Sequence, residues 1–402
     1  MKRIDRPGYS EKIKSFLTAP VIIVVTGMRR VGKSVLLRQL MDELADSGHV
    51  IYIDKESLEY DEIENARDLV RWVEERTVSG PPSYVIVDEI QLISDWERAA
   101  AALASKDDTH LIISGSNAQL LSGDLATRIA GRYVSIPIFP LSLNEFSDLY
   151  SLLHIPVSSG KDLFALYLKT GGLPGLLHTD LSTDVYTQMQ KDIFNTIVVK
   201  DIITRHNIRD VRLLQDVMQF SMDNIGSLFS AKRISDFLKK ERRNLSVDSV
   251  LNYLEYMREG FLLYRVSRYD IKGKKLLEVL QKYYLGDIGL RNGLVGYRDS
   301  DISGLLENLV YLELLRRGFT VRIGTLPDSE VDFIAEKEPH RLYIQVSYLL
   351  ESASTIDREL APLKKLEDAW PKLLLSLDEY QPRVFEGIRH ISIIDFLMGG
   401  EI

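Results

Sequence analysis

The feature that most constrains this sequence is an apolar segment that runs directly into a glycine-rich loop ending in Lys-Ser. Residues 21–26, Val-Ile-Ile-Val-Val-Thr, predict a buried strand, and Gly27–Ser34 follow with the pattern G-x-x-x-x-G-K-S. The two glycines let backbone N–H groups turn inward around phosphates, where a Cβ would obstruct the turn or the ligand. The segment therefore predicts the phosphate-binding loop of an α/β domain, in preference to an isolated glycine turn.

This loop predicts a site for ATP and Mg²⁺. Lys33 should lie against the β- and γ-phosphates and Ser34 offers a hydroxyl to Mg²⁺, while the following helix directs its positive N-terminus at the same anion. The expected ATP contacts are Gly27, Met28, Arg29, Arg30, Val31, Gly32, Lys33, Ser34 and Val35.

A second motif is expected on a neighbouring strand, because a hydrolysing nucleotidase needs a carboxylate for Mg²⁺ and often another group to polarise water. Residues 84–87 are apolar or aromatic, and two acids, Asp88 and Glu89, follow them directly. We predict that Asp88 is the Mg²⁺-side ligand and that Glu89 orients the attacking water. The alternative is a solvated strand end, but two adjacent acids favour an enzyme that hydrolyses ATP over a simple nucleotide binder.

A third predicted strand, Leu111–Ser114, runs into Gly-Ser-Asn. Ser116 or Asn117 could sense the γ-phosphate there and position water, although such a turn is also an ordinary loop. Farther on, Arg128 and Arg132 stand one helical turn apart. Either could act as an arginine finger, within the subunit or across an interface of a homo-oligomer, because a guanidinium stabilises charge on the transferred phosphoryl group. A surface salt bridge is the alternative for each.

These motifs carry a resemblance to a known family. The order T-G-x-R-R-V-G-K-S, I-V-D-E-I-Q, S-G-S-N and G-R-Y, followed by Ile136–Phe146 and later by Gly171–Pro174, resembles the prokaryotic AAA-like ATPases. More narrowly, the chain is similar to a bacterial and archaeal group whose ATPase domain is joined to a C-terminal domain of unknown function. The resemblance covers nearly the whole chain and is most specific in the first 180 residues. It implies a core that binds and hydrolyses ATP, and it names no substrate.

Composition limits the remaining possibilities. At 402 residues, 45% of them hydrophobic, the chain is long enough for two or three cores. The absence of cysteine excludes disulfides and thiolate metal sites. No apolar run approaches about 20 residues, and the N-terminus lacks the apolar core of a signal peptide. We therefore expect a soluble, cytoplasmic protein without a membrane partner.

The net charge of −8 hides a basic region within an acidic chain. Residues 191–296 contain 19 Lys and Arg against 13 Asp and Glu, a net charge of +6, which leaves −14 for the remainder. Within this region, 231–240 and 247–258 predict two amphipathic helices, 261–266 a strand and 272–275 a basic turn. This order is the outline of a winged helix.

A winged helix predicts contact with double-stranded DNA through basic groups on phosphates, which would make binding strongly salt-dependent. The alternative is an inter-domain packing unit whose charges form a solvated face. The candidate DNA contacts are Lys239, Lys240, Arg242, Arg243, Arg268, Lys272, Lys274 and Lys275.

Residues 305–348 predict a helix followed by three strands, an order similar to the restriction-endonuclease fold. In active members of that fold a helix Glu, an Asp and a carboxylate-x-lysine triplet gather Mg²⁺ and activate water. Here Glu307 and Asp332 stand at the first two places, but Gln345-Val346-Ser347 replaces the triplet, so one ligand is neutral and the activating amine is missing. The pattern predicts a degenerate module for binding or assembly and argues against cleavage.

The expected fold class is therefore an α/β P-loop NTPase with a parallel sheet, extended by three further parts. The parts are an AAA-like ATPase core (1–140), a helical lid (141–190), a winged-helix region (191–296) and an inactive restriction-endonuclease-like domain (297–402). For function, the sequence predicts an ATP-driven switch that acts on DNA or on a protein partner. The alternatives are a nucleotide-gated DNA-binding or scaffold protein with negligible turnover, and an ATP-regulated nuclease.

Overall fold

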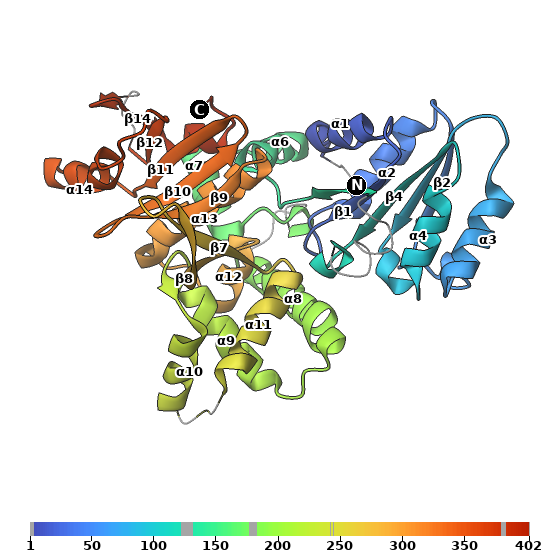
Figure 1. The fold of residues 1–402 in the computed structure, drawn as a ribbon, viewed down its shortest axis with the longest axis horizontal. Helices are drawn as coiled ribbons and strands as arrows, with labels where there is room; N and C mark the ends of the chain where they lie inside the picture. Colours follow the sequence, from blue (N-terminus) through green and yellow to red (C-terminus); the bar gives the residue numbers. More distant parts are fainter. Residues whose placement is uncertain are drawn as a thin grey trace. The chain divides into compact units, whose positions relative to one another are not determined.

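The computed structural model describes residues 4–121, 132–176, 183–241, 243, 245–378 and 383–401. Its contacts divide the chain into two units, drawn from blue to red along the sequence in Figure 1. The first unit contains Met1–Pro140, Leu173–His178 and Glu259–Phe261, and the second contains Leu141–Gly172, Thr179–Arg258 and Leu262–Ile402. Two of the predicted site residues, Arg128 and Arg242, lie outside the described residues.

The first unit is built on a parallel sheet, which in the described part of the chain has the strand order β2-β3-β4-β1-β5. The strands are β1 (Ile22–Thr26), β2 (His49–Asp54), β3 (Ser83–Asp88), β4 (Thr109–Gly115) and β5 (Tyr133–Pro137). Every residue of β1 and β3 is buried, as expected for parallel strands that are covered on both faces. Because the strands are parallel, the segments that follow β1, β3 and β4 leave the sheet at the same edge.

Helices cover both faces of this sheet, with α1 and α2 on one side and α3 and α4 on the other (Figure 1). They are α1 (Pro7–Phe16), α2 (Lys33–Leu44), α3 (Ala66–Arg76) and α4 (Trp96–Ala104). Short turns of 3₁₀-helix connect these elements: η1 (Leu58–Tyr60), η2 (Ile90–Leu92), η3 (Ala118–Leu121) and η4 (Pro174–Leu176). The apolar faces of α3 and α4 form one core with alternate side chains of the strands, including Val24, Val85 and Ile113. The AAA-like parallel sheet predicted from the sequence is thereby confirmed.

The second unit is built on a mixed sheet, whose described strands follow the order β13-β14-β12-β11-β10-β9-β7-β8-β6. Their bounds are β6 (Leu228–Phe229), β7 (Leu263–Asp270), β8 (Lys275–Leu285), β9 (Thr320–Thr325), β10 (Glu330–Lys337), β11 (His340–Val346), β12 (Lys372–Ser376), β13 (Arg383–Phe385) and β14 (Ile388–Ser392). The hairpin β7–β8 joins the rest of the sheet through parallel pairing of β7 with β9. One sheet therefore continues across residues 296 and 297, where the sequence placed a domain boundary.

The helices of the second unit begin with the segment for which we predicted a lid. They are α6 (Leu143–Leu153), α7 (Gly160–Thr170), α8 (Thr183–Ile197), α9 (Val211–Asp223), α10 (Ala231–Lys240), α11 (Val247–Glu259), α12 (Ile288–Val295), α13 (Ile302–Arg316), α14 (Ala353–Lys364) and α15 (Ile393–Leu397). A π-helix, η5 (Val198–Thr204), continues α8, and the 3₁₀ turn η6 (Asp299–Asp301) precedes α13. The predicted helices at 231–240 and 247–258 are confirmed as α10 and α11.

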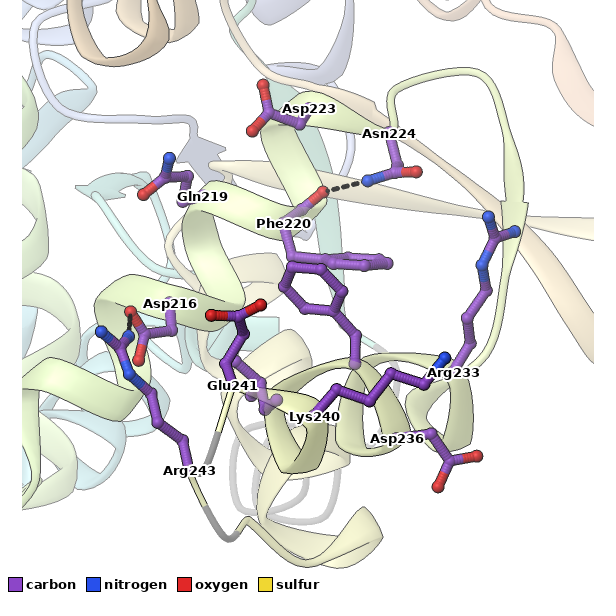
Figure 2. Close-up of a pocket in the computed structure, with 12 residues that line it drawn as sticks. Asp216, Gln219, Phe220, Asp223, Asn224, Arg233, Asp236, Lys240, Glu241 and Arg243 are labelled. Atoms are coloured by element: carbon purple, nitrogen blue, oxygen red, sulfur yellow. Dashed lines mark hydrogen bonds and ion pairs between the residues drawn. The ribbon is translucent and has the colours of Figure 1, made fainter.

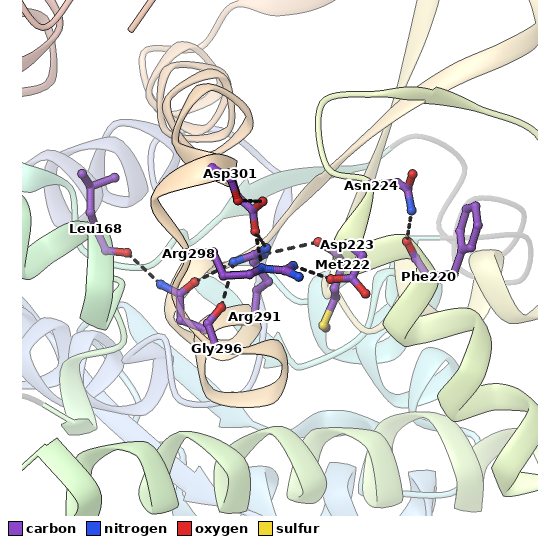
Figure 3. A network of polar contacts seen from close by, with 11 residues as sticks. Leu168, Phe220, Met222, Asp223, Asn224, Arg291, Gly296, Arg298 and Asp301 are labelled. Carbon is purple, nitrogen blue, oxygen red and sulfur yellow. Dashed lines mark hydrogen bonds and ion pairs between the residues drawn. The ribbon is translucent and has the colours of Figure 1, made fainter.

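A buried arginine on α12 ties several of these helices together (Figure 3). Arg291 is 1% exposed and donates to the backbone oxygens of Met222, in the last turn of α9, and of Gly296 after α12, and it also pairs with Asp301. Arg298 contacts the same Asp301. Since a buried guanidinium without these acceptors would be very unfavourable, the network holds α9, α12 and the start of α13 in one arrangement.

Among the described helices, none combines the length and the apolar character needed to cross a bilayer.

Candidate nucleotide-binding site

The glycine-rich loop follows β1 and leads into α2, as the sequence predicted. Gly27 has a φ of +154°, and a Cβ there would lie 2.4 Å from the carbonyl oxygen of Ile138. Gly32 has a φ of +97°, in the left-handed region, and serves as the N-cap of α2. Both glycines are therefore required by the local structure, one for close approach of the backbone and the other for conformation.

Lys33 is the first residue of α2, and its side chain folds back along the loop. It is 5% exposed, and its ammonium donates to the carbonyl oxygens of Gly27 at 3.0 Å and Met28 at 3.4 Å. The same Nζ lies 3.4 Å from Oε1 of Glu89. The structure thus places the loop lysine and the predicted water-orienting acid next to each other.

Asp88 ends β3 and is buried among hydroxyl groups. It accepts hydrogen bonds from Ser114 at the end of β4, from Tyr52 on β2 at 3.2 Å, and from Ser34 on α2. Burial raises the pKa of Asp88 above its usual value even though the hydroxyls of Ser114 and Ser34 oppose that shift. The adjacent hydroxyl of Ser34 and carboxylate of Asp88 are hard oxygen donors of the kind that Mg²⁺ takes beside substrate phosphates. These residues therefore fit the predicted metal position.

Glu89 adopts a left-handed conformation, with φ of 54° and ψ of 48°, which is unusual for a residue with a Cβ. Its N–H donates to Oγ of Ser114 at 3.1 Å, and its Oε2 accepts from Oγ of Ser116 at 3.3 Å. Burial alone would raise the pKa of Glu89, but the charges of Lys33 and Arg29 and the contact with Gln91 lower it below its usual value. The buried side chain is accordingly held as a carboxylate.

Of the two polar candidates after β4, the structure brings Ser116 to the acid pair. Asn117 is fully buried in the next position, where its carbonyl oxygen accepts from Leu120 N–H at 3.3 Å. Arg132 lies elsewhere: it is exposed, and its carbonyl oxygen accepts from Ile22, the first residue of β1. The loop follows the last residue of β1, so Arg132 stands at the opposite edge of the sheet. An arginine finger from Arg132 within the same chain is therefore wrong, and a role across an interface stays a prediction.

Two contacts around the loop were not identified from the sequence. Arg6, which precedes α1, is buried and donates to the carbonyl oxygens of Val31 in the loop and Phe139 after β5. Gln91 donates from Nε2 to Oε2 of Glu89. The contacts of Arg6 could not be identified from the sequence, because its partners are distant in the chain. Gln91, by contrast, lies inside the I-V-D-E-I-Q motif.

The predicted DNA contacts of the second unit fall into two groups. Lys272, Lys274 and Lys275 are all exposed and follow one another at the turn between β7 and β8. Lys239 and Lys240 are exposed at the end of α10, and Lys239 lies 4.0 Å from Asp236. Three of the predicted contacts are thus exposed together at the β7–β8 turn, whereas Arg268 on β7 is half-buried.

Arg243 is directed into a pocket of about 690 Å³ between α9 and α10 (Figure 2). There it pairs with Asp216, and Figure 2 shows the two side chains turned toward each other. Glu241, Asp223 and Asp236 also line this pocket, together with Arg233 and Lys240. The surroundings of Arg243 are thus of mixed charge, and they do not form the basic face predicted for DNA phosphates.

The three residues of the nuclease-like pattern do come together. Glu307 on α13 interacts electrostatically with Asp332 on β10, and Oε1 of Gln345 on β11 accepts from the Asp332 N–H at 3.4 Å. The pairing of β9 with β10 shifts register at Asp332, a β-bulge of the kind that re-aims a side chain. Among the described residues, no group of three or more His, Asp or Glu side chains is arranged to hold a metal ion.

The expectation that this cluster lacks an amine is wrong. Lys282 on β8 reaches it, with Nζ 2.6 Å from Glu330, 3.2 Å from Glu307 and 3.7 Å from Asp332. Burial would lower the pKa of Lys282, but the three carboxylates raise it. Burial and Glu307 raise the pKa of Asp332 to about 8. Sequence spacing could not reveal this lysine, because it comes from the predicted winged-helix region and meets the acids only through the shared sheet.

The Gly171-Gly172 pair of the family pattern lies in the second unit and contacts another buried acid. The N–H of Gly172 donates to Asp287 at 2.8 Å, and a Cβ on Gly171 would lie 2.4 Å from the same carboxylate. Asp287 also caps α12 by accepting from Leu290 N–H at 3.1 Å. Burial raises the pKa of Asp287 to about 6, although these backbone donors oppose the shift. In this structure the glycine pair is therefore a packing motif.

Comparisons with known proteins agree with this geometry. A family model described as an AAA domain matches residues 19–147, which include the loop, the acid pair and β4. A second model, a domain of unknown function (DUF8612), matches residues 161–301. Residues 19–147 thus match an AAA domain, and residues 161–301 match a domain whose function is not known.

Relatives extend the similarity over nearly the whole chain. An uncharacterized protein of Haemophilus influenzae is 35% identical over 400 residues, covering 98% of both chains. An uncharacterized protein of Methanocaldococcus jannaschii is 26% identical over 390 residues, covering 93% of this chain and 85% of that protein. Among solved structures, a Walker-type ATPase of Pyrococcus abyssi has a TM-score of 0.51 at 16% identity, covering 73% of this chain and 96% of that one. This last likeness concerns the fold alone.

Proposed function

This chain belongs to the family of the Haemophilus influenzae protein, and from that premise we propose that it is an ATP-hydrolysing switch whose first unit carries the reaction. The observation that supports hydrolysis is the convergence of Lys33, Ser34, Asp88 and Glu89 at the carboxyl edge of one parallel sheet. A protein that only binds nucleotide has no use for a second buried, ionised acid beside the loop lysine.

Each side chain has a task in the proposed reaction. Lys33 would donate to the phosphates, and Ser34 and Asp88 would hold Mg²⁺, which when bound neutralises charge on phosphate oxygens. Glu89 would orient a water molecule and accept its proton. The water oxygen then bonds to the γ-phosphorus, the bond from that phosphorus to the bridging oxygen breaks, and ADP leaves with the electron pair.

Two substitutions test this proposal in the full chain. Lys33→Ala should abolish both ATP binding and turnover, whereas Glu89→Gln should retain binding and reduce kcat by roughly 10²- to 10⁴-fold. Lys106→Ala and Glu74→Gln are matched controls, because this exposed pair joins α3 to the segment that follows α4 in the same unit. Equal turnover in wild type and Glu89→Gln would contradict the role of Glu89. Binding without any wild-type turnover would favour the nucleotide-gated scaffold.

For the partner, we propose contact with double-stranded DNA through the β7–β8 turn. The three exposed lysines there support phosphate contact, whereas the exposed residues of α11 include Val247, Leu251 and Asp248, and its Arg258 is paired with Glu255. Contact through the turn alone would be independent of DNA sequence. A winged-helix role for α10 and α11 in DNA recognition is thus less well supported than a role in contacts with protein.

A salt titration of duplex binding tests this surface. Replacing Lys272, Lys274 and Lys275 with Ala should weaken binding uniformly across sequences and reduce the slope of log K against log salt by up to about three. The matched control replaces Lys12, Lys14 and Lys106 of the first unit, which removes the same charge. Equal slopes in the two triple variants would exclude the turn from the interface.

We propose that the carboxylate cluster of the second unit does not cleave DNA. Its lysine lies within 3.7 Å of three acids, and Gln345 provides a neutral group where a carboxylate ligand is expected. Nicking of supercoiled DNA that requires Mg²⁺ and is lost in Asp332→Ala would overturn this view and favour the ATP-regulated nuclease.

A further inference from the structure

Gln91 lies two residues after Glu89, on the 3₁₀ turn η2 that follows the acid pair. In this turn the N–H of Leu92 donates to the carbonyl oxygen of Glu89 at 3.1 Å. The left-handed backbone of Glu89 turns the chain so that Gln91 folds back, and its Nε2 donates to Oε2 of Glu89. No role in the proposed reaction has so far been assigned to this amide.

A glycine on the neighbouring strand provides the space for this contact. A Cβ on Gly115, the last residue of β4, would lie 2.4 Å from Oε1 of Gln91 and 2.1 Å from Cδ1 of Leu120. The φ of Gly115 is not in the left-handed region, so glycine is needed here for space and not for conformation. Because Gly115 has no side chain, the Gln91 amide can pack directly against β4.

The side chains that contact the Glu89 carboxylate differ in whether they also bind the phosphates in the proposed reaction. Lys33 approaches Oε1, but in the proposed reaction its ammonium also serves the phosphates. Gln91 and Ser116 both contact Oε2 and carry no charge. A neutral donor can keep the carboxylate in one orientation throughout the reaction without competing for the phosphate oxygens.

We propose that Gln91 is a positioning residue for ATP hydrolysis, which holds the Glu89 carboxylate so that it can accept the proton of the attacking water. Gly115 contributes to this positioning because it leaves space for the Gln91 amide. This inference rests on the proposed hydrolysis of ATP. It predicts that loss of the amide affects turnover and leaves nucleotide binding in place.

The test compares Gln91→Met, which keeps the side chain's length and removes the donor, with wild type. We expect kcat to fall about 10- to 100-fold, because small displacements of a catalytic group have effects of that size. KM and the Kd for a fluorescent ATP analogue should change less than twofold. Gln39→Met is the matched control, since Gln39 also makes side-chain hydrogen bonds in this unit but contacts Ile4 and Asp5. Gly115→Ala should repeat the kcat effect.

A double-mutant cycle separates positioning from a structural role. In a Glu89→Gln background, Gln91→Met should cause no further fall in kcat, because a residue that acts through Glu89 has nothing left to position. An equal fall in both backgrounds, a parallel loss of nucleotide affinity, or an unchanged kcat in Gln91→Met would each overturn the inference while wild-type turnover remains. Absence of wild-type turnover would instead overturn the proposed function, and this inference with it.

Discussion

Both units bury carboxylates around one lysine, and the two arrangements can be compared directly. In the first unit, Lys33 shares its ammonium between two backbone carbonyl oxygens and one carboxylate, that of Glu89 at 3.4 Å. In the second, Lys282 lies between three carboxylates, the nearest at 2.6 Å. An ammonium with one counter-ion at 3.4 Å can move to contact an incoming phosphate, whereas one that lies among three buried acidic side chains cannot leave them without a large electrostatic cost. Similar residue types thus form two arrangements, which we propose act as a reactive site in the first unit and as a structural cluster in the second.

Asp287 provides a third arrangement, a buried carboxylate without a lysine. Its oxygens accept from the backbone N–H groups of Gly172 and Leu290, and its pKa rises to about 6. Backbone dipoles only partly replace the solvation that this acid loses on burial. The three arrangements therefore differ in the donors that surround the buried carboxylates: one lysine with neutral donors, one lysine shared by three acids, or backbone N–H groups alone.

The largest expected effect separates the two lysines by function. Lys33→Met should lower kcat/KM for ATP by about 10³-fold or more, because a preorganised cation at the phosphates is lost. Thermal stability should change little, since Glu89 keeps Gln91 and Ser116 as donors. Steady-state ATPase assays and thermal unfolding measure the two quantities. A large fall in stability with turnover retained would show that Lys33 behaves like Lys282.

The reverse result is expected for Lys282→Met. Removal of this counter-ion leaves three acids buried together and should reduce the free energy of unfolding of the second unit by about 3–5 kcal/mol. Urea denaturation followed by circular dichroism measures this loss, with Lys365→Met as a control because Lys365 pairs with Asp328 at the surface. Unfolding of Lys282→Met and Lys365→Met at the same urea concentration would contradict a structural role for Lys282.

Asp287 should make stability depend on pH in the opposite sense to a salt-bridged acid. Its pKa is raised from 3.8 to about 6 in the fold, so its stabilising contribution is complete below about pH 4 and is lost as pH rises through 6. Relative to Asp287→Asn, the wild type should therefore gain up to about 3 kcal/mol between pH 7 and pH 4. Denaturation of both proteins across this range measures the difference, and a difference that does not vary with pH would contradict it.

The smallest effect concerns the support of the phosphate loop. Arg6→Met removes two hydrogen bonds to buried carbonyl oxygens, at Val31 and Phe139, and should destabilise the first unit by about 1–3 kcal/mol. ATP affinity should fall only severalfold, because Lys33 and the glycines remain. Isothermal titration with ATP measures the affinity, and Arg67→Met on the exposed start of α3 is the control. Loss of binding as complete as in Lys33→Met would mean that Arg6 contacts the ligand itself.

The nucleotide site was predictable from the sequence because its chemistry is local. Gly27, Gly32, Lys33 and Ser34 form one contiguous segment, and Asp88 and Glu89 stand at the end of a second apolar segment, β3. Gln91 was visible in the same motif, but its contact with Glu89 depends on a left-handed backbone and on the space at Gly115. Neither condition follows from residue spacing.

Where the predictions were wrong, chain connectivity was the cause. Arg132 follows the motifs closely in sequence, but β5 runs parallel to β1, so the residue before β5 stands at the edge opposite the loop. Lys282 belongs to a segment for which the sequence predicts a separate winged-helix region, and it enters the carboxylate cluster because the sheet continues from β8 through β7 to β9 and β10.

By itself the sequence determined the elements and the phosphate loop, since backbone conformation, apolar periodicity and a contiguous ligand set are properties of neighbouring residues. The tertiary structure decided which charges are neighbours: Lys33 beside one acid, Lys282 among three, and Asp287 against the backbone of Gly172. Electrostatic energies depend on distance through space and on burial, and a linear sequence specifies neither.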